Sequence, residues 1–267
     1  MQVYNILYSY NEVTKLLTGD FHTHGAYSHG NGSAVENARV AHEKGLKSIA
    51  ITEHGMNILV GGLRKREFAG AKEEVRRANE AYPDVRTYYG IEADLISPNG
   101  KIDIKDEYLD DFEVLLVGMH HWVFGNVFGL ASLVWRNFHH WLFRGKRMMS
   151  KVNTRALINT MRRYPIDALS HPGDGMRDYD LAAVAKVAVE TDTCLELNNK
   201  HRSLTFEQLR FLSSTDVKFL LGSDAHDPDT VGEVDDYLKF ALDAGIDPAS
   251  ILNLDREYIP KKYRNQK

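Results

Sequence analysis

A short apolar run that ends in a polar residue and leads into a helical pattern recurs along this chain of 267 residues. Such runs at residues 114–117 and 217–221 are nearly continuous in apolar side chains, which is typical of strands buried on both faces of a parallel sheet. Strands that alternate with helices predict such a sheet, with right-handed crossovers. Seven segments follow this form or end in the same way, and they finish in Asp20-Phe21-His22-Thr23-His24, Ile51-Thr52-Glu53-His54, Gly90-Ile91-Glu92, Val117-Gly118-Met119-His120, Ala168-Leu169-Ser170-His171, Leu195-Glu196-Leu197-Asn198 and Leu220-Leu221-Gly222-Ser223-Asp224.

The segments between these runs have helical spacing. Apolar residues repeat with a helical period from Phe68 to Tyr82, and Pro83 ends that pattern. The turn sequence Pro98-Asn99-Gly100 predicts a hairpin after the third strand. Seven strand–helix units close economically into a barrel, and an open doubly wound sheet is the alternative. Three pairs fit the capping box, in which two side chains satisfy free backbone donors at a helix start: Ser33 with Glu36, Thr205 with Gln208, and Thr230 with Glu233.

Length and composition predict one domain over residues 1–267. This length is within the range of single α/β barrels, and 43% hydrophobic with 26% charged residues is an ordinary globular balance. The net charge of −4, without a concentrated basic face, argues against duplex nucleic acid as a partner. Cys194 is the only cysteine, so neither an intramolecular disulfide nor a thiolate zinc site is available. The first 17 residues lack a signal-peptide pattern, and we expect a cytoplasmic protein.

The most apolar stretch, residues 122–143, belongs to an insertion over about residues 122–147. Its uncharged part ends at Arg136, which is short of the roughly 20 residues that span a bilayer, so we expect no membrane span. We interpret the segment as a helical aromatic insertion packed on the barrel, or as a lid or a surface through which the chain forms homo-oligomers. Contact with a membrane surface is the less favoured alternative.

Histidines and carboxylates gather at the predicted strand ends. The carboxyl ends of parallel strands lie on one face, which is where α/β folds place their chemistry. Side chains alternate along a strand, so His22 and His24 point the same way, and Asp224 and His226 repeat that spacing. Imidazole combined with carboxylate favours Zn, Mn or Fe. Seven of the twelve histidines fall at or just after a predicted strand end: His22, His24, His29, His54, His120, His171 and His226.

The order of these motifs resembles the PHP (polymerase and histidinol phosphatase) family in its stand-alone bacterial form. The resemblance covers roughly residues 18–253. It implies a distorted, TIM-like (β/α)7 barrel of seven strands with up to three metal ions, and it implies hydrolysis of phosphoesters. Six motifs carry it: Asp20-Phe21-His22-Thr23-His24, Thr52-Glu53-His54-Gly55, Gly90-Ile91-Glu92, Gly118-Met119-His120, Ser170-His171-Pro172-Gly173 and Gly222-Ser223-Asp224-Ala225-His226.

Carried onto this chain, the resemblance also implies which residues bind each ion. The family often has Asp where this chain has His29. Glu92, Asp224 and His226 would be catalytic as well as ligands, and two to three divalent transition-metal ions would activate water and polarise the phosphoester. The first ion would be held by His22, His24, Glu92 and Asp224, the second by Glu92, His120 and His171, and the third by His29, His54 and His226.

A phosphate substrate needs cations beside the metals, and a metal-bound histidine needs an acceptor for its other ring nitrogen. His201 is either a proton donor to the leaving group or an ordinary loop histidine. Candidate substrate-binding cations are Arg64, Arg177, Lys200 and Arg202, and candidate acceptors are Asp20, Glu53 and Asp227.

The predicted activity is hydrolysis of a small phosphorylated substrate, as a phosphatase or phosphodiesterase. One alternative is an amidohydrolase-like metal hydrolase, which also begins with His-x-His but carries a bridging lysine where this chain has Glu92. A second is a 3′–5′ exonuclease-type phosphodiesterase acting on nucleic acid, against which the acidic balance counts. A third is a metal-binding regulator without activity.

Overall fold

The computed structural model describes residues 16–58, 61–120, 146–174 and 178–264. Seven strands pair in parallel and in sequence order, from the first to the seventh. Thr23 also forms a parallel bridge with Ala225, so the first strand meets the end of the last and the barrel is nearly closed. The predicted distorted seven-stranded barrel is confirmed, rather than the open sheet. The strands are β1 (Gly19–Thr23), β2 (Ser48–His54), β3 (Arg86–Asp94), β4 (Val114–Gly118), β5 (Ala168–Leu169), β6 (Cys194–Asn198) and β7 (Phe219–Gly222).

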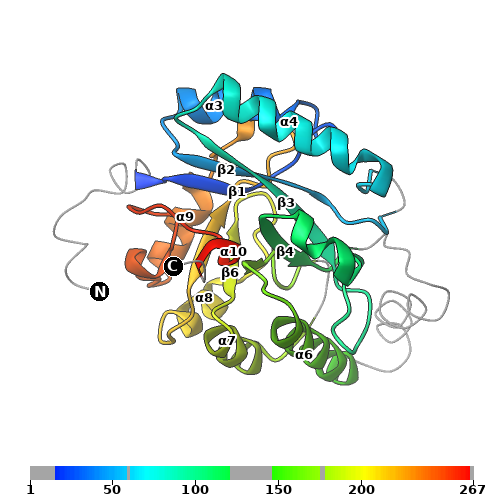
Figure 1. Cartoon of the computed structure of the whole chain (residues 1–267). Coiled ribbons are helices and arrows are strands. Elements are labelled where there is room, and N and C mark those ends of the chain that lie inside the picture. Colours follow the sequence, from blue (N-terminus) through cyan, green and yellow to red (C-terminus); the bar gives the residue numbers. More distant parts are fainter. Residues whose placement is uncertain (1–15, 59–60, 121–145, 175–177, 265–267) are drawn as a thin grey trace.

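Helices surround the barrel, with α3 and α4 packed together on one side and α6 and α7 on the opposite side (Figure 1). The α-helices are α3 (Ala34–Glu43), α4 (Phe68–Ala81), α6 (Lys146–Arg163), α7 (Leu181–Glu190), α8 (Phe206–Leu212), α9 (Asp235–Asp243) and α10 (Lys261–Arg264). Short 3-10 helices are η2 (Lys65–Glu67), η3 (Asp106–Asp111), η4 (Pro228–Thr230) and η5 (Pro248–Ser250).

Most local signals fold as the sequence predicts. The apolar stripe of α4 is buried, and the capping boxes of Ser33 and Thr205 begin α3 and α8. Gly100 takes the positive φ of +76° that its hairpin turn requires, and Leu95 pairs with Ile102 in antiparallel fashion across it.

The capping box predicted at Thr230 is wrong. Asp227 accepts a hydrogen bond from the backbone of Asp229, and Pro228 occupies the first position of η4, so a short 3-10 helix forms there instead. The Thr230 hydroxyl therefore donates to the Asp227 carbonyl, and α9 begins only at Asp235.

One face of the strands changes from apolar to polar along the barrel. Ala50, Leu116, Cys194 and Leu220 belong to one buried apolar cluster, which Tyr258 also joins. Burial raises the pKa of the Cys194 thiol to about 12, as expected of an inert core thiol. Even spacing along a strand keeps side chains on one face. Four residues after each of those four apolar residues, in the same order, stand His54, His120, Asn198 and Asp224.

Some predictions fall on other parts of the chain. Arg177 and residues 121–145, with nearly all of the predicted helical insertion and of its surface for homo-oligomers, lie outside the described residues. Within the described ranges, none of the helices combines the length and the apolar character that a membrane span requires.

Candidate metal centre

Glu92 lies at the centre of a cluster of imidazoles at the carboxyl end of the barrel. Its side chain, on β3, is fully buried. One oxygen, Oε1, is 2.9 Å from His171 Nε2 and 3.5 Å from His120 Nε2. The other, Oε2, is 2.9 Å from His54 Nδ1 and 3.4 Å from His22 Nε2. Histidines from four different strand ends therefore meet on one carboxylate.

Asp224 is a second carboxylate of the same cluster. Its Oδ1 is 3.3 Å from both His24 Nε2 and His226 Nδ1, and 3.8 Å from His22 Nε2. The residue has a φ of +56°, in the left-handed region that Asp tolerates better than most residues. This backbone turn directly after β7 aims the carboxylate at β1.

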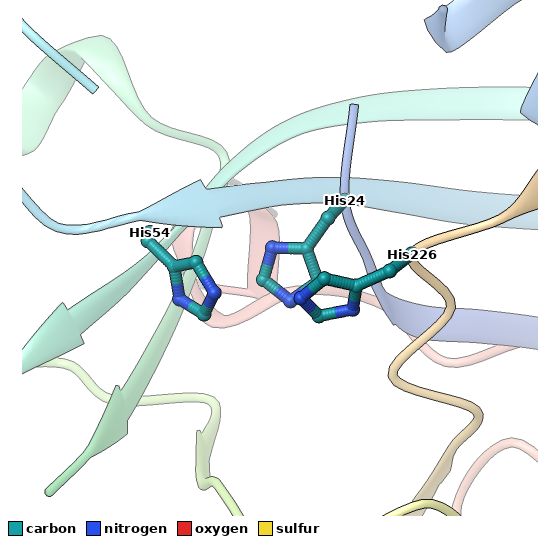
Figure 2. Close-up of side chains that lie close together, drawn as sticks. All are labelled: His24, His54 and His226. Carbon is teal, nitrogen blue, oxygen red and sulfur yellow. The ribbon is translucent and has the colours of Figure 1, made fainter. Parts of the chain in front are cut away.

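Three imidazoles face one another beside these carboxylates. Figure 2 shows His24 from the end of β1, His54 from the end of β2 and His226 from the loop after β7 pointing into a common space. The His24 ring centroid is 4.3 Å from that of His54 and 4.2 Å from that of His226. Burial and the facing His54 hold the pKa of His24 well below its ordinary value. Neutral imidazole is the form that binds a metal ion.

The charge state of the cluster favours ionised carboxylates. Burial opposes ionisation of Glu92 and Asp224, but the neighbouring histidines outweigh it and hold both pKa values well below the ordinary range. Burial also opposes protonation of His120, but Glu92 and Asp94 outweigh it and raise its pKa to about 10. The ligand-bearing end of the barrel is thus built around fixed negative charge.

Seven of the nine predicted ligands fall into sets whose ligand atoms lie within 4.8 Å of one another. Of the other two, His171 contacts Glu92, whereas His29 is exposed and its ring centroid is 5.4 Å from that of His54. The sets are His22, His24 and Asp224; His54, Glu92 and His120; and His24, His54 and His226.

The donor atoms of this cluster fit metal ions. Leaving a buried donor or acceptor unsatisfied costs about 1–3 kcal/mol, and most buried polar groups have a partner. Metal ions would satisfy several such atoms at once. Five ligand atoms are buried and make no hydrogen bond among the described residues, although His54 Nδ1 and Glu92 Oε2 lie 2.9 Å apart without the alignment that a hydrogen bond requires. They are His22 Nε2, His24 Nε2, His54 Nδ1, Glu92 Oε2 and Asp224 Oδ1.

Two buried carboxylates that the sequence analysis did not single out contact the histidines. Glu196 Oε1 is 2.6 Å from His22 Nδ1, and Asp94 Oδ1 is 2.9 Å from His120 Nδ1. Asp94 shares a strand face with the predicted ligand Glu92, and Glu196 shares one with Asn198, which contacts Asp224. Period-two spacing from Glu92 to Asp94 was the available signal for one of them.

The three acceptors considered from the sequence take other positions. Asp20 accepts from the backbone of Ser223 and of Gly232, not from an imidazole. Glu53 accepts from the Ser28 hydroxyl, whose oxygen is 3.4 Å from His24 Nδ1, so it reaches the cluster indirectly. Asp227 begins η4.

The predicted substrate-binding cations also differ in position. Lys200 Nζ is 2.8 Å from His226 Nδ1 and lies at the cluster. The Arg64 guanidinium donates to two backbone carbonyls of the loop after β2. Arg202 pairs with Asp236 on α9, with 2.9 Å between Nη2 and Oδ2.

His201 lies closer to the cluster than an ordinary loop histidine would. Its Nε2 is 3.5 Å from Asp224 Oδ2, and its Nδ1 is 3.5 Å from Asp174 Oδ2. The hydrogen bond with Asp174 raises the pKa of this half-exposed imidazole. His201 therefore lines the rim of the cluster.

Known proteins are similar to this chain in sequence and in fold. A probable phosphatase of Thermoanaerobacter sp. (strain X514) is 26% identical over 258 residues, which cover 92% of this chain and 95% of that protein. A probable phosphatase of Syntrophotalea carbinolica is 29% identical over 243 residues, covering 88% of this chain and 90% of its own. Both alignments extend over nearly the whole of each chain.

A solved structure has the same barrel. Histidinol phosphate phosphatase of Lactococcus lactis, in complex with zinc, L-histidinol and phosphate, superposes with a TM-score of 0.57 at 14% sequence identity. The match covers 86% of this chain and 95% of that chain. The sequence profile of the PHP domain matches residues 20–201, which is more than half of the chain. This protein therefore belongs to the PHP domain family, as its motifs predict.

Proposed function

We propose that this chain is a metal-dependent phosphatase that hydrolyses small phosphoesters at the cluster around Glu92 and Asp224. The observation that carries the proposal is the set of five buried ligand atoms without hydrogen-bond partners, all at one end of the barrel. Family membership and the probable phosphatases among its relatives support the reaction class. The acidic net charge supports a small substrate rather than duplex nucleic acid.

Two to three divalent transition-metal ions, Zn, Mn or Fe, are the proposed cofactors, because the donor set mixes imidazole with carboxylate and contains no thiolate. Close approach of Glu92 to four histidines supports its role as a shared ligand. His24 is a further candidate ligand of the third ion, since its ring faces the rings of both His54 and His226. The proposed ligands are His22, His24, His29, His54, Glu92, His120, His171, Asp224 and His226.

When bound, such ions lower the pKa of coordinated water and polarise the phosphoryl oxygens. The chain's own groups hold that chemistry in place. Glu92 and Asp224 keep negative charge between the imidazoles, and the low pKa of His24 keeps its ring neutral. His226, at the rim, joins them as the third catalytic residue that we propose.

Among the described residues, Lys200 is the cation best placed to meet an incoming phosphate. Its Nζ lies 3.5 Å from Asp224 Oδ1, and its side chain is 43% exposed, so it borders both the cluster and solvent. We expect Lys200→Ala to raise KM for p-nitrophenyl phosphate by about tenfold, because a hydrogen bond to a charged group contributes about 1.5 kcal/mol or more and about 1.4 kcal/mol corresponds to a factor of ten. Steady-state kinetics with parallel metal analysis measures this.

Arg202→Ala is the matched control, because Arg202 lies two residues away and pairs with Asp236 outside the cluster. Unchanged KM in Lys200→Ala, or an equal rise in both variants, would contradict a role for Lys200 in binding phosphate.

The proposed function is tested on the purified wild-type protein. Elemental analysis should find two to three transition-metal ions per chain, and p-nitrophenyl phosphate should be hydrolysed in a chelator-sensitive reaction. Bound metal without hydrolysis of phosphomonoesters or phosphodiesters would overturn the phosphatase proposal. Protein that stays empty after incubation with Zn²⁺, Mn²⁺ or Fe²⁺ would overturn the metal centre itself.

A further inference from the structure

We propose that Glu196, on β6, is the positioning residue that fixes three ligand-bearing segments of the metal centre in register. The inference rests on the proposed function, because it concerns how the ligands of that centre are held. Glu196 is buried in the barrel, on the same strand face as Asn198. It touches residues on both sides of β6 and reaches as far as β1.

Each oxygen of Glu196 accepts hydrogen bonds from a different part of the cluster. Oε1 is 2.6 Å from His22 Nδ1 on β1. Oε2 accepts from the backbone N–H of His171 at 2.7 Å and from Asn198 Nδ2 at 3.1 Å. Asn198 Nδ2 also lies 3.2 Å from Asp224 Oδ2, so the network extends to the ligand after β7.

The contact with His22 selects which ring nitrogen faces the metal centre. A carboxylate can only accept hydrogen bonds, so His22 in the neutral form that binds a metal ion carries its hydrogen on Nδ1 beside Glu196. Its Nε2 then keeps a free lone pair, and this is the atom that points at Glu92 and Asp224. Such outer contacts orient metal-binding histidines and raise their basicity.

The contact with His171 holds an unusual backbone conformation. His171 has a φ of +26°, in the left-handed region that non-glycine residues rarely adopt. Its N–H donates to Glu196 Oε2, while its ring Nε2 lies 2.9 Å from Glu92 Oε1. Glu196 therefore stabilises the turn that presents this imidazole.

Gly222 supplies the space in which Glu196 reaches His22. A Cβ atom at position 222 would lie 2.3 Å from Glu196 Oε1 and 3.0 Å from His22 Cβ. A larger residue at position 222 would therefore disturb the contact between Glu196 and His22. The absence of a side chain at this strand position is thus part of the same arrangement.

The inference is tested by Co²⁺ binding to the full-length Glu196→Gln variant. Glutamine has the shape of glutamate, but one of its two terminal groups is an NH₂ donor. While His22 keeps its hydrogen on Nδ1, the glutamine NH₂ faces either that N–H or the two donors that Oε2 accepts, so no orientation satisfies all contacts. The other tautomer of His22 would remove the Nε2 lone pair that faces the metal centre. We expect Co²⁺ affinity, from competition with a chelator, to fall 10- to 100-fold. The visible absorption spectrum of bound Co²⁺ should change as well.

Asp167→Asn is the matched control. Asp167 is also buried, and its two oxygens also accept from three donors: the Tyr258 hydroxyl, Lys261 N and Leu115 N. It precedes β5, at the end of the barrel opposite the cluster. Thermal unfolding with chelator present compares the loss of stability in the two variants, and only Glu196→Gln should lose Co²⁺ affinity.

Gly222→Ala provides a second variant, since it keeps every polar group yet intrudes on Glu196 Oε1. Gly222→Ala should therefore also lower Co²⁺ affinity. If Glu196→Gln fails to fold, wild-type Co²⁺ affinity in Gly222→Ala would contradict the inference. Wild-type Co²⁺ affinity and spectrum in Glu196→Gln, or an equal loss of Co²⁺ affinity in Asp167→Asn, would overturn this inference but leave the proposed function standing. A wild-type protein that binds no Co²⁺ would overturn the proposed function, and this inference with it.

Discussion

Glu92→Gln is expected to lower kcat/KM for p-nitrophenyl phosphate by on the order of 10³-fold. The substitution keeps the shape of the side chain but removes the charge that lies closest to four imidazoles. Bound metal ions stabilise developing charge by several kcal/mol, and each 1.36 kcal/mol corresponds to a tenfold change in rate. Elemental analysis should show the loss of at least one ion per chain, because a neutral amide is a poor bridging ligand.

Glu113→Gln makes the same chemical change at the opposite end of the barrel. Glu113 lies just before β4, accepts a hydrogen bond from the backbone of Tyr89 at 2.8 Å and forms an ion pair with Arg86. Its substitution should leave kcat/KM and metal content within about twofold of wild type. If Glu92→Gln kept both full metal content and full activity, Glu92 could not be the shared ligand that we propose.

Removal of the metal ions is expected to lower the melting temperature by about 5–10 °C. A ligand present at 100 times its Kd stabilises the native state by about 2.7 kcal/mol. In a domain of roughly this size each kcal/mol corresponds to about 2–4 °C. Without ions, the five unsatisfied ligand atoms remain buried at the end of the barrel. Scanning calorimetry of the metal-loaded protein, with and without a chelator, measures the difference.

The response should depend on the cluster and not on the chelator itself. In Glu92→Gln the chelator should shift the melting temperature by clearly less than in wild type. Re-addition of the same metal should restore the wild-type value. Identical melting temperatures for loaded and chelated wild-type protein would show that the ions do not bind in the native barrel as we propose.

The strand ends of this fold could be predicted from the sequence because two local rules sufficed. Apolar runs mark buried parallel strands, and their carboxyl ends share one face. His54 and Glu92, neighbours in register on β2 and β3, come together for that reason alone. The turn at Gly100 and the caps at Ser33 and Thr205 were predictable on equally local grounds.

The contacts of Glu196, Arg64 and Arg202 depend on tertiary structure. Glu196 meets His22 because β7, between their strands, carries a glycine at the crossing point. Arg64 donates to backbone carbonyls because the loop after β2 folds back upon it. Arg202 pairs with Asp236 because α9 packs beside β6. Neither spacing nor composition encodes these approaches, so the contacts of these three side chains could not be predicted from the sequence.

The bridge between Thr23 and Ala225 also determines when the centre can be assembled. His22 and Glu196 lie 174 residues apart in the chain, and such non-local contacts form late because their loop-closure entropy must be overcome first. A growing polypeptide that has not yet produced β7 carries His22, Glu92 and His171 but lacks Asp224 and the strand that closes the barrel. The complete ligand set that we propose for the first ion therefore exists only once the chain extends past β7.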